Sequence, residues 1–390
     1  MVKAFQFAHL PRIFFGIGKA AGLPELIRSF GNNIVLLTGK RSFVNSAEGE
    51  KIISGLKKDK IRFHHFEIPG EPSPGMIDLT VQKLKGEAVD VVVAIGGGSV
   101  LDAGKAVSAM LHEPGDIIDY LEDVGTKAHS GRKVPFIALP TTSGTGSEAT
   151  KNAVITKRGH DGFKKSLRHE NFVPDIAVID PILTISCPPG ITAAGGLDCF
   201  TQLFEAFLSG KSSEYTDALA LEGLKAVKRS LYRCFLDGND REARSDMSFA
   251  ALTSGICLAN AGLGAVHGFA GTIGGLFDIP HGVICGTLMA AANEMNVKVL
   301  RSCGENHPAL TKYTMVGRIF SDIDGRSDDY YIDAFIQYLH KITNDLNMQR
   351  LGSYGLTEND IHSISINTNI KNNPVRLETD DLANILKDRL

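Results

Sequence analysis

The most constraining stretch of this sequence is a short apolar run that passes through three glycines into a helix-forming segment. Residues 91–95 have the β-branched composition of a buried parallel strand, and Gly96-Gly-Gly-Ser99 follows at once. Residues 100–110 then have a helical pattern. Glycines let backbone N–H groups approach an anion, and the start of a helix adds positive potential. The sequence therefore predicts an α/β domain with a phosphate-binding turn, although a tight connection without a ligand has the same pattern.

The rest of the first half repeats this alternation of strand and helix. Strands are expected at residues 34–38, 64–68, 91–95, 134–139 and 176–180, and helices at about 46–58, 78–85 and 100–110. Three prolines between residues 69 and 75 exclude a helix from that loop. A second loop, residues 140–148, adds hydroxyls and glycines after a neighbouring strand. Two such loops at the carboxyl ends of parallel strands define a ligand crevice.

The pattern of apolar residues in the sequence changes at Asp180-Pro181. Beyond about residue 183, Ala- and Leu-rich segments with helical spacing replace the β-branched runs. Helices are expected at about 190–209, 213–235, 240–261, 264–277, 282–300, 308–321, 327–346 and 378–389. We therefore predict an α/β domain of residues 1–183 and an all-helical domain of residues 184–390.

Composition and net charge limit the kinds of molecule that the protein is expected to bind. The 390 residues are 43% hydrophobic, which is ample for the cores of two or three domains. A net charge of -3 gives no electrostatic reason to expect nucleic acid or a membrane surface, so small molecules are favoured. No stretch has the roughly eighteen uninterrupted apolar residues of a membrane span. The six cysteines are scattered and the N-terminus lacks a signal-peptide core, which predicts reduced thiols and a cytoplasmic location.

Four polar residues of the second half, Asp198, Gln202, His267 and His281, form a candidate metal site. Asp198 and Gln202 lie one turn apart on an expected helix, so both can point at one object. Glu205 follows at the next near-turn position. His267 and His281 each stand beside glycine in an apolar context. Taken singly, each has a commoner role, the aspartate as a helix cap and a histidine as a satisfied polar group.

The motifs together resemble those of the iron-containing (group III) alcohol dehydrogenases. The matching stretches, in family order, are Gly96-Gly-Gly-Ser-Val-Leu-Asp-Ala-Gly-Lys105, Pro140-Thr-Thr-Ser-Gly-Thr-Gly-Ser-Glu148, Gly196-Leu-Asp198 and Ile279-Pro-His-Gly282. The resemblance implies a Rossmann-like dinucleotide domain, a helical metal and substrate domain, and an active site in the cleft between them. It also implies an NAD(P)-dependent oxidoreductase that interconverts an alcohol and an aldehyde or ketone with a divalent metal, Fe²⁺ or Zn²⁺. A homodimer or higher homo-oligomer is the default expectation.

Carried over position by position, the resemblance gives each site residue a role. The implied metal ligands are Asp198, Gln202, His267 and His281, and all of these except Gln202 are also implied catalytic residues. The implied cofactor contacts are Gly39, Gly97, Gly98, Ser99, Asp102, Thr141, Thr142, Ser147 and Lys164. Lys165 competes with Lys164, because the segment around them is degenerate.

Three positions depart from the family pattern. Gln202 stands in place of a histidine ligand, and an amide oxygen is a weaker ligand for transition metals than imidazole. Gly271 replaces a second histidine, so a proton relay through that imidazole is absent. Gly39, followed by Lys40 and Arg41, replaces an aspartate that holds the adenosine ribose. This favours NADP over NAD, unless the two cations are only solvated surface charges.

Other functions remain open from the sequence. One is a metal-independent reductase of the maleylacetate type, which has a similar scaffold. Another is a nucleotide-binding protein with weakened catalysis, suggested by Gln202 and Gly271. A lyase on the dehydroquinate-synthase scaffold is disfavoured, because the second half shows no basic pocket for a phosphate-bearing substrate.

Overall fold

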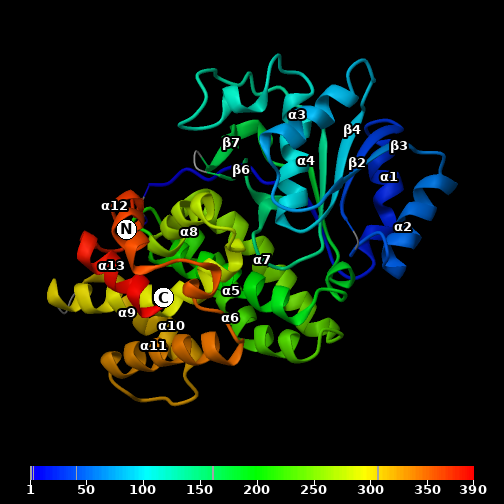
Figure 1. The fold of residues 1–390 in the computed structure, drawn as a ribbon. Helices are drawn as coiled ribbons and strands as arrows, with labels where there is room; N and C mark the ends of the chain where they lie inside the picture. The colour runs from blue at the N-terminus through cyan, green and yellow to red at the C-terminus, as the bar shows by residue number, and fades with distance from the viewer. Residues whose placement is uncertain (1, 3, 41, 160–161, 305–306) are drawn as a thin grey trace.

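A parallel sheet and a helical bundle form the two halves of the chain (Figure 1). The computed structural model describes residues 2, 4–40, 42–159, 162–304 and 307–390. Six parallel strands lie in the order β1-β8-β5-β4-β2-β3, and β6 pairs with β7 as a separate antiparallel hairpin. The strands are β1 (Arg12–Phe15), β2 (Asn33–Gly39), β3 (Arg62–Ile68), β4 (Val91–Gly96), β5 (Phe136–Pro140), β6 (Asn152–Lys157), β7 (Phe163–Arg168) and β8 (Ile176–Ile179).

Helices of the first half cover both faces of the sheet. They are α1 (Leu23–Arg28), α2 (Ala47–Lys58), α3 (Pro74–Lys83) and α4 (Gly98–Met110). Successive side chains of a strand point to opposite faces. Val92 of β4 therefore lies in one core cluster with Val107 of α4, whereas Val93 lies in another with Leu56 of α2. Because both faces are covered, every residue of β4 is buried, and the expected α/β architecture is confirmed.

The glycine turn lies where the strand order reverses. β4 is between β2 and β5, and Thr38 of β2 pairs with Ile95 of β4, so Gly39 and Gly96 end neighbouring strands. Gly96 in turn pairs with Pro140 at the end of β5. Open parallel sheets bind ligands outside the carboxyl ends of their strands at such a point. The fold thus brings the loops 96–99 and 140–148 to one edge of the sheet.

The second half consists of helices packed around α5. They are α5 (Pro189–Leu208), α6 (Glu214–Leu236), α7 (Arg241–Ala261), α8 (Ala265–Leu276), α9 (His281–Ser302), α10 (Pro308–Phe320), α11 (Asp328–Asp345), α12 (Glu358–Asn367) and α13 (Thr379–Asp388). α5 contacts α6, α7 and α9 and is buried over most of its length. The expected helical second half is confirmed. Among the described residues, no single helix has the length and apolarity to cross a membrane, and α7 and α8 pass only jointly, as a pair bent by 96°.

Several local expectations differ from the structure. α3 begins at Pro74, inside the loop that was expected to exclude a helix, because proline suits a first helical position and Ser73 Oγ accepts a hydrogen bond from the Met76 amide. The strand expected at residues 134–139 begins at Phe136. β1, α1, the β6–β7 hairpin and α12 were not expected. Three cations in the six residues of β7 hide it from an apolar pattern.

Candidate active site

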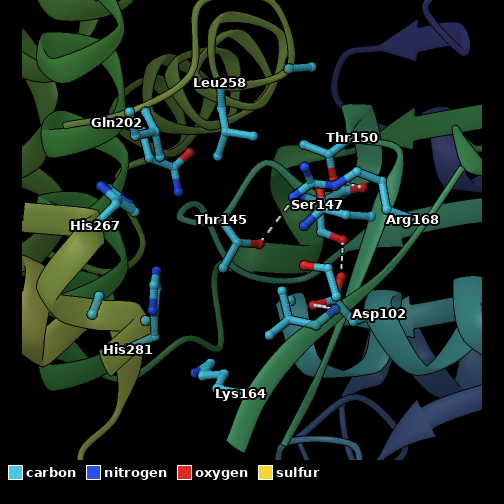
Figure 2. Close-up of a pocket in the computed structure, with 18 of the residues that line it drawn as sticks. Asp102, Thr145, Ser147, Thr150, Lys164, Arg168, Gln202, Leu258, His267 and His281 are labelled. Carbon is cyan, nitrogen blue, oxygen red and sulfur yellow. Dashed lines mark hydrogen bonds between the residues drawn. The ribbon is translucent and has the colours of Figure 1, made fainter. Parts of the chain in front are cut away.

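A cavity lies between the sheet half and the helical half of the chain. Its volume is about 540 Å³, within the range of small-molecule sites (Figure 2). The start of α4, the loop after β5 and the β6–β7 hairpin line one side, and α5, α7, α8 and α9 line the other. The predicted site residues that line it are Gly98, Ser99, Asp102, Ser147, Lys164, Gln202, His267 and His281.

The glycine turn leaves no room for side chains where it meets the loop after β5. A Cβ added at Gly98 would lie 2.7 Å from both Cγ2 and Oγ1 of Thr145. A Cβ at Gly97 would lie 3.2 Å from the Thr142 hydroxyl. Gly97 is the N-cap of α4 and gives no side-chain cap to the helix, so the first amides of α4 remain available to an anion. The turn fits a dinucleotide pyrophosphate.

Asp102 and Lys105 fasten this turn to the second loop and the hairpin. Ser147 Oγ donates to Asp102 Oδ1 at 2.5 Å, and the Val154 amide donates to Asp102 Oδ2 at 3.1 Å. The buried Lys105 ammonium donates to the Ser147 carbonyl at 2.9 Å and the Asn152 carbonyl at 2.7 Å. Burial lowers the pKa of Lys105 to about 8, against the opposing effect of Asp102. Asp102 and Ser147 therefore act in holding the loops, and both also line the cavity.

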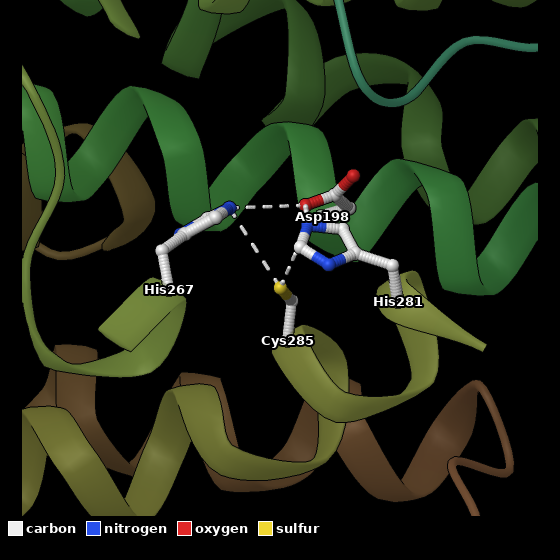
Figure 3. A group of neighbouring side chains, drawn as sticks. All are labelled: Asp198, His267, His281 and Cys285. Carbon is white, nitrogen blue, oxygen red and sulfur yellow. Dashed lines mark hydrogen bonds and ion pairs between the residues drawn. The ribbon is translucent and has the colours of Figure 1, made fainter. Parts of the chain in front are cut away.

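Four side chains converge on one point across the cavity from the glycine turn. The group comprises Asp198 of α5, His267 of α8, and His281 and Cys285 of α9, and its ligand atoms all lie within 4.8 Å of one another (Figure 3). Asp198 Oδ1 is 3.2 Å from His267 Nε2 and 3.6 Å from His281 Nε2. Both imidazoles thus turn the same nitrogen toward one carboxylate. A carboxylate, two imidazoles and a thiol are the donors of a divalent transition-metal site, so these residues fit such an ion.

Glu205 orients His267 from behind. Its Oε2 is 2.7 Å from His267 Nδ1, and its Oε1 accepts a hydrogen bond from the Val266 amide at 2.7 Å. A carboxylate in this place fixes a metal-binding imidazole with Nε2 forward. The sequence places Glu205 near the site without giving it this role.

The protonation preferences of the group follow from its burial and its charges. Burial opposes ionisation of Asp198, but His281 and His267 outweigh it and lower the pKa of the carboxyl. Burial also acts to lower the pKa of His267, but Cys285, Asp198 and Glu205 together raise it well above 6.5. Burial dominates at His281 and lowers its pKa to about 4, despite Asp198. A neutral imidazole is the form that binds a metal ion.

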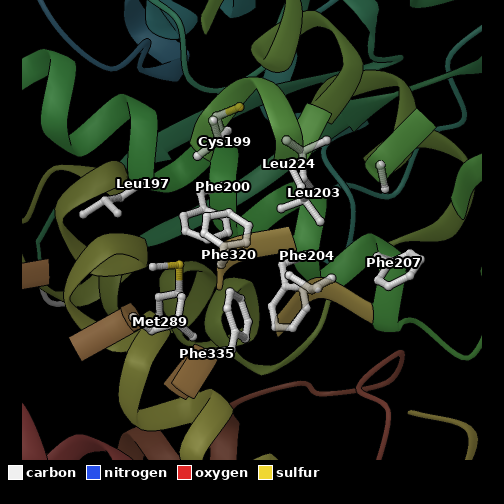
Figure 4. Close-up of a cluster of buried hydrophobic side chains, with 14 of the residues drawn as sticks. Leu197, Cys199, Phe200, Leu203, Phe204, Phe207, Leu224, Met289, Phe320 and Phe335 are labelled. Atoms are coloured by element: carbon white, nitrogen blue, oxygen red, sulfur yellow. The ribbon is translucent and has the colours of Figure 1, made fainter. Parts of the chain in front are cut away.

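The opposite face of α5 anchors the helix. Phe200 lies two positions from both Asp198 and Gln202, and Phe204 lies two positions from Gln202, so both side chains turn away from the cavity (Figure 4). The Phe200 ring stacks on Phe320 with centroids 5.1 Å apart, and Phe204 meets Phe335 edge-on at 4.9 Å. This packing fixes the direction in which the polar face of α5 points.

Gln202 and Gly271, which stand where the family pattern has histidines, both line the cavity. Gln202 Nε2 donates to Asp198 Oδ1 at 3.3 Å, and its Oε1 accepts from Ser254 Oγ at 2.9 Å. The amide oxygen therefore faces Ser254, and the amide nitrogen faces Asp198. At Gly271 an added Cβ would meet nothing within 4 Å, so this position leaves open space on the cavity wall.

The remaining predicted cofactor residues differ in whether they line the cavity. Lys164 lines it and forms an ion pair with Glu71 at 2.6 Å, whereas Lys165 pairs with Asp123 at 2.8 Å. The residues Gly39, Gly97, Thr141 and Thr142 do not line it. Thr141 lies next to the turn, since its amide donates to the Gly96 carbonyl at 2.9 Å. Arg41, part of the argument for NADP, lies outside the described residues.

Two family models match most of the chain. Residues 11–181 match the family model described as iron-containing alcohol dehydrogenase. Residues 192–390 match the model described as Fe-containing alcohol dehydrogenase family, C-terminal.

Individual relatives are similar over nearly their full length. The NADPH-dependent butanol dehydrogenase of Clostridium saccharobutylicum is 28% identical over 354 residues, which cover 90% of this chain and 87% of that protein. The crystal structure of a 1,3-propanediol oxidoreductase is 26% identical with a TM-score of 0.88, and 100% of each chain is covered. A sulfoacetaldehyde reductase from Bifidobacterium kashiwanohense, in complex with NAD+, is 27% identical with a TM-score of 0.86, and 99% of each chain is covered.

Proposed function

The chain belongs to the iron-containing alcohol dehydrogenase family, and we propose that it carries out the family reaction with a divalent metal held by the Asp198 group and with NADP in the glycine turn. It is an oxidoreductase that interconverts an alcohol and an aldehyde or ketone with NAD(P). The observation that carries the proposal is the convergence of two imidazole Nε2 atoms on one buried carboxylate oxygen, across a single cavity from the glycine turn.

The residues of the chain divide the work between the two sides of the cavity. A bound divalent cation would supply a Lewis acid for the substrate oxygen, and a bound nicotinamide would supply the hydride donor or acceptor. Asp198, His267 and His281 would hold the cation. Gly98 and Ser99 would bind the pyrophosphate and so orient the cofactor toward the metal group. Because helices on one side and the sheet edge on the other fix these groups, the reacting atoms meet in a restricted geometry.

The proposal has a direct test in metal removal. Protein treated with a chelator should lose NADPH-dependent reduction of short-chain aldehydes, and added Fe²⁺ or Zn²⁺ should restore it. Absorbance of NADPH measures the rate, and metal analysis of the same samples measures the occupancy. Activity that is equal before and after complete metal removal would favour the metal-independent reductase. Tight NADPH binding without turnover of any alcohol or aldehyde would favour a catalytically weakened binding protein.

The preference for NADP over NAD rests on the end of β2. Gly39 gives no carboxylate to repel a 2′-phosphate, and the exposed Lys40 adds a positive charge beside it. A Cβ at Gly39 would make only ordinary contacts, at 3.8 Å from Ser42 Oγ and 4.0 Å from Val100 Cγ2. The position therefore has room for the aspartate that the family commonly carries.

Gly39→Asp should reverse the cofactor preference. The new carboxylate repels the 2′-phosphate and accepts hydrogen bonds from a free ribose, so kcat/KM for NADPH should fall about 30-fold relative to NADH, or about 2 kcal/mol. Steady-state rates with both cofactors measure the change. Gly39→Ala is the matched control, since it adds the Cβ without the charge. If the wild-type enzyme already prefers NADH, or if both variants behave alike, the charge argument is wrong.

Other parts of the proposal concern the domain boundary, the oligomeric state and the cellular location. We propose a division of the chain at residues 183/184, a homodimer or higher homo-oligomer, and a cytoplasmic location. The location is supported by the cysteines, all six of which are free thiols. Light scattering of the purified protein would measure the oligomeric state.

A further inference from the structure

The thiol of Cys285 lies beside the carboxylate and the two imidazoles of the converging group. α9 begins at His281, and Cys285 follows one turn later on the same face of the helix. Its Sγ is 3.7 Å from His281 Nε2 and 3.7 Å from His267 Nε2, and the residue is fully buried (Figure 3). The sulfur therefore lies near both imidazole nitrogens that would bind the cation.

The Gln202 side chain is oriented to donate a hydrogen bond to Asp198, with its amide oxygen turned toward Ser254. Its amide nitrogen, which has no lone pair for a metal, donates to Asp198 Oδ1. Its oxygen, the only ligand atom of the side chain, lies 2.9 Å from Ser254 Oγ, whose single hydrogen is shared between this oxygen and the Ala251 carbonyl at 2.8 Å. Rotating the amide by half a turn would set that oxygen against the Asp198 carboxylate oxygen. The hydrogen-bond network thus favours Gln202 as a donor that steadies Asp198.

We infer that Cys285 Sγ, and not Gln202, is the fourth protein ligand, so that this chain binds its metal with one carboxylate oxygen, two imidazole nitrogens and one thiolate. This inference rests on the proposed metal site and specifies its chemistry. Binding releases the thiol proton to solvent and forms the bond from sulfur to metal, with no change in oxidation state. The Gln202 side-chain amide holds the Asp198 carboxylate in position by donating a hydrogen bond to Oδ1.

A thiolate changes which ion the site prefers. Sulfur is a soft ligand that favours Zn²⁺, whereas an amide or carboxylate oxygen suits Mg²⁺ and Mn²⁺. Fe²⁺ binds nitrogen and sulfur sites more weakly than Zn²⁺ in the general order of divalent metals. The wild-type protein should therefore retain Zn²⁺ against an equal concentration of Fe²⁺, and metal analysis after dialysis with both ions would measure this preference.

The closing experiment uses Co²⁺, whose absorption spectrum reports on sulfur ligands. The full-length protein is freed of metal and loaded with Co²⁺, and metal analysis confirms the stoichiometry. We expect an intense sulfur-to-cobalt charge-transfer band in the near ultraviolet. Cys285→Ser should lose this band, and its Zn²⁺ affinity should fall at least about 100-fold, since a whole ligand is lost. Cys234→Ser, which changes a buried thiol of α6, should keep the band, as should Gln202→Leu.

The outcomes separate the inference from the proposed function. Stoichiometric Co²⁺ without a charge-transfer band in the wild-type protein overturns the inference and leaves the metal-dependent reaction standing. A band that persists in Cys285→Ser overturns it as well. Failure of the wild-type protein to bind Co²⁺ or Zn²⁺ overturns the inference together with the proposed metal site. The wild-type spectrum decides the matter even if the Cys285 variant does not fold.

Discussion

Asp198→Asn should lower kcat/KM for aldehyde reduction about 1000-fold and remove stoichiometric metal. The substitution keeps the shape of the side chain but removes the negative charge that both imidazole Nε2 atoms face, at 3.2 Å and 3.6 Å. Asp198 is buried, so bulk water cannot replace the lost charge. Lewis-acid stabilisation contributes several kcal/mol to such reactions, and about 4 kcal/mol corresponds to about 1000-fold in rate.

Metal content and cofactor affinity together identify the cause of that loss. The variant should retain less than one tenth of the wild-type metal, while its dissociation constant for NADPH changes little, because the glycine turn lies across the cavity. Asp246→Asn is the matched control, since Asp246 of α7 binds Arg229 and Ser230 of α6 and does not line the cavity. A variant that keeps both its metal and most of its activity would show that Asp198 is not a ligand.

The sequence predicted the architecture because the patterns that determine it are local. The apolar run at 91–95, the glycine turn and the loop at 140–148 each require a strand, a turn or a helix start, and parallel strands bring their ends together. Pro74 shows the limit of such rules. Proline breaks the interior of a helix but is favoured in the first turn, so position within the element decides its effect.

Three members of the converging group, Asp198, His267 and His281, were among the residues predicted from the sequence, whereas Cys285 was not. The signal for Cys285 was present in the sequence, since it stands one turn after His281, as Gln202 stands one turn after Asp198. Spacing alone cannot choose between these two partners. The choice depends on Ser254, an α7 residue far away in the sequence, which binds the Gln202 oxygen. Such tertiary contacts are not readable from local spacing.

On the cofactor side as well, some features follow from the local sequence and others depend on contacts between distant segments. The glycines of the turn are evident from the sequence, but the reason for Gly98 is the Thr145 side chain, which belongs to the loop after β5. Lys105 likewise joins α4 to the β6 strand by donating to the Asn152 carbonyl. The shape of the cofactor site therefore depends on three segments that are held together by a few buried polar contacts.

Gly98→Ala should raise the dissociation constant for NADPH about 100-fold. The added Cβ would lie 2.7 Å from two atoms of Thr145, so the loop or the start of α4 must move away from the pyrophosphate. Charge-assisted hydrogen bonds contribute about 1.5–3 kcal/mol each, and the loss of one or two matches about 3 kcal/mol. Because the metal group lies on the other side of the cavity, metal content should stay at the wild-type level.

Fluorescence titration with NADPH measures this effect, and Gly190→Ala supplies the control. Gly190 also lies in the first turn of a helix, α5, but a Cβ there would meet nothing within 4 Å. Both variants add one methyl group to a helix start, so a difference between them isolates the contact with Thr145. If Gly98→Ala binds NADPH as tightly as the wild type, the cofactor phosphates do not bind at this turn. A loss of the same size in Gly190→Ala would instead indicate a general effect on the fold.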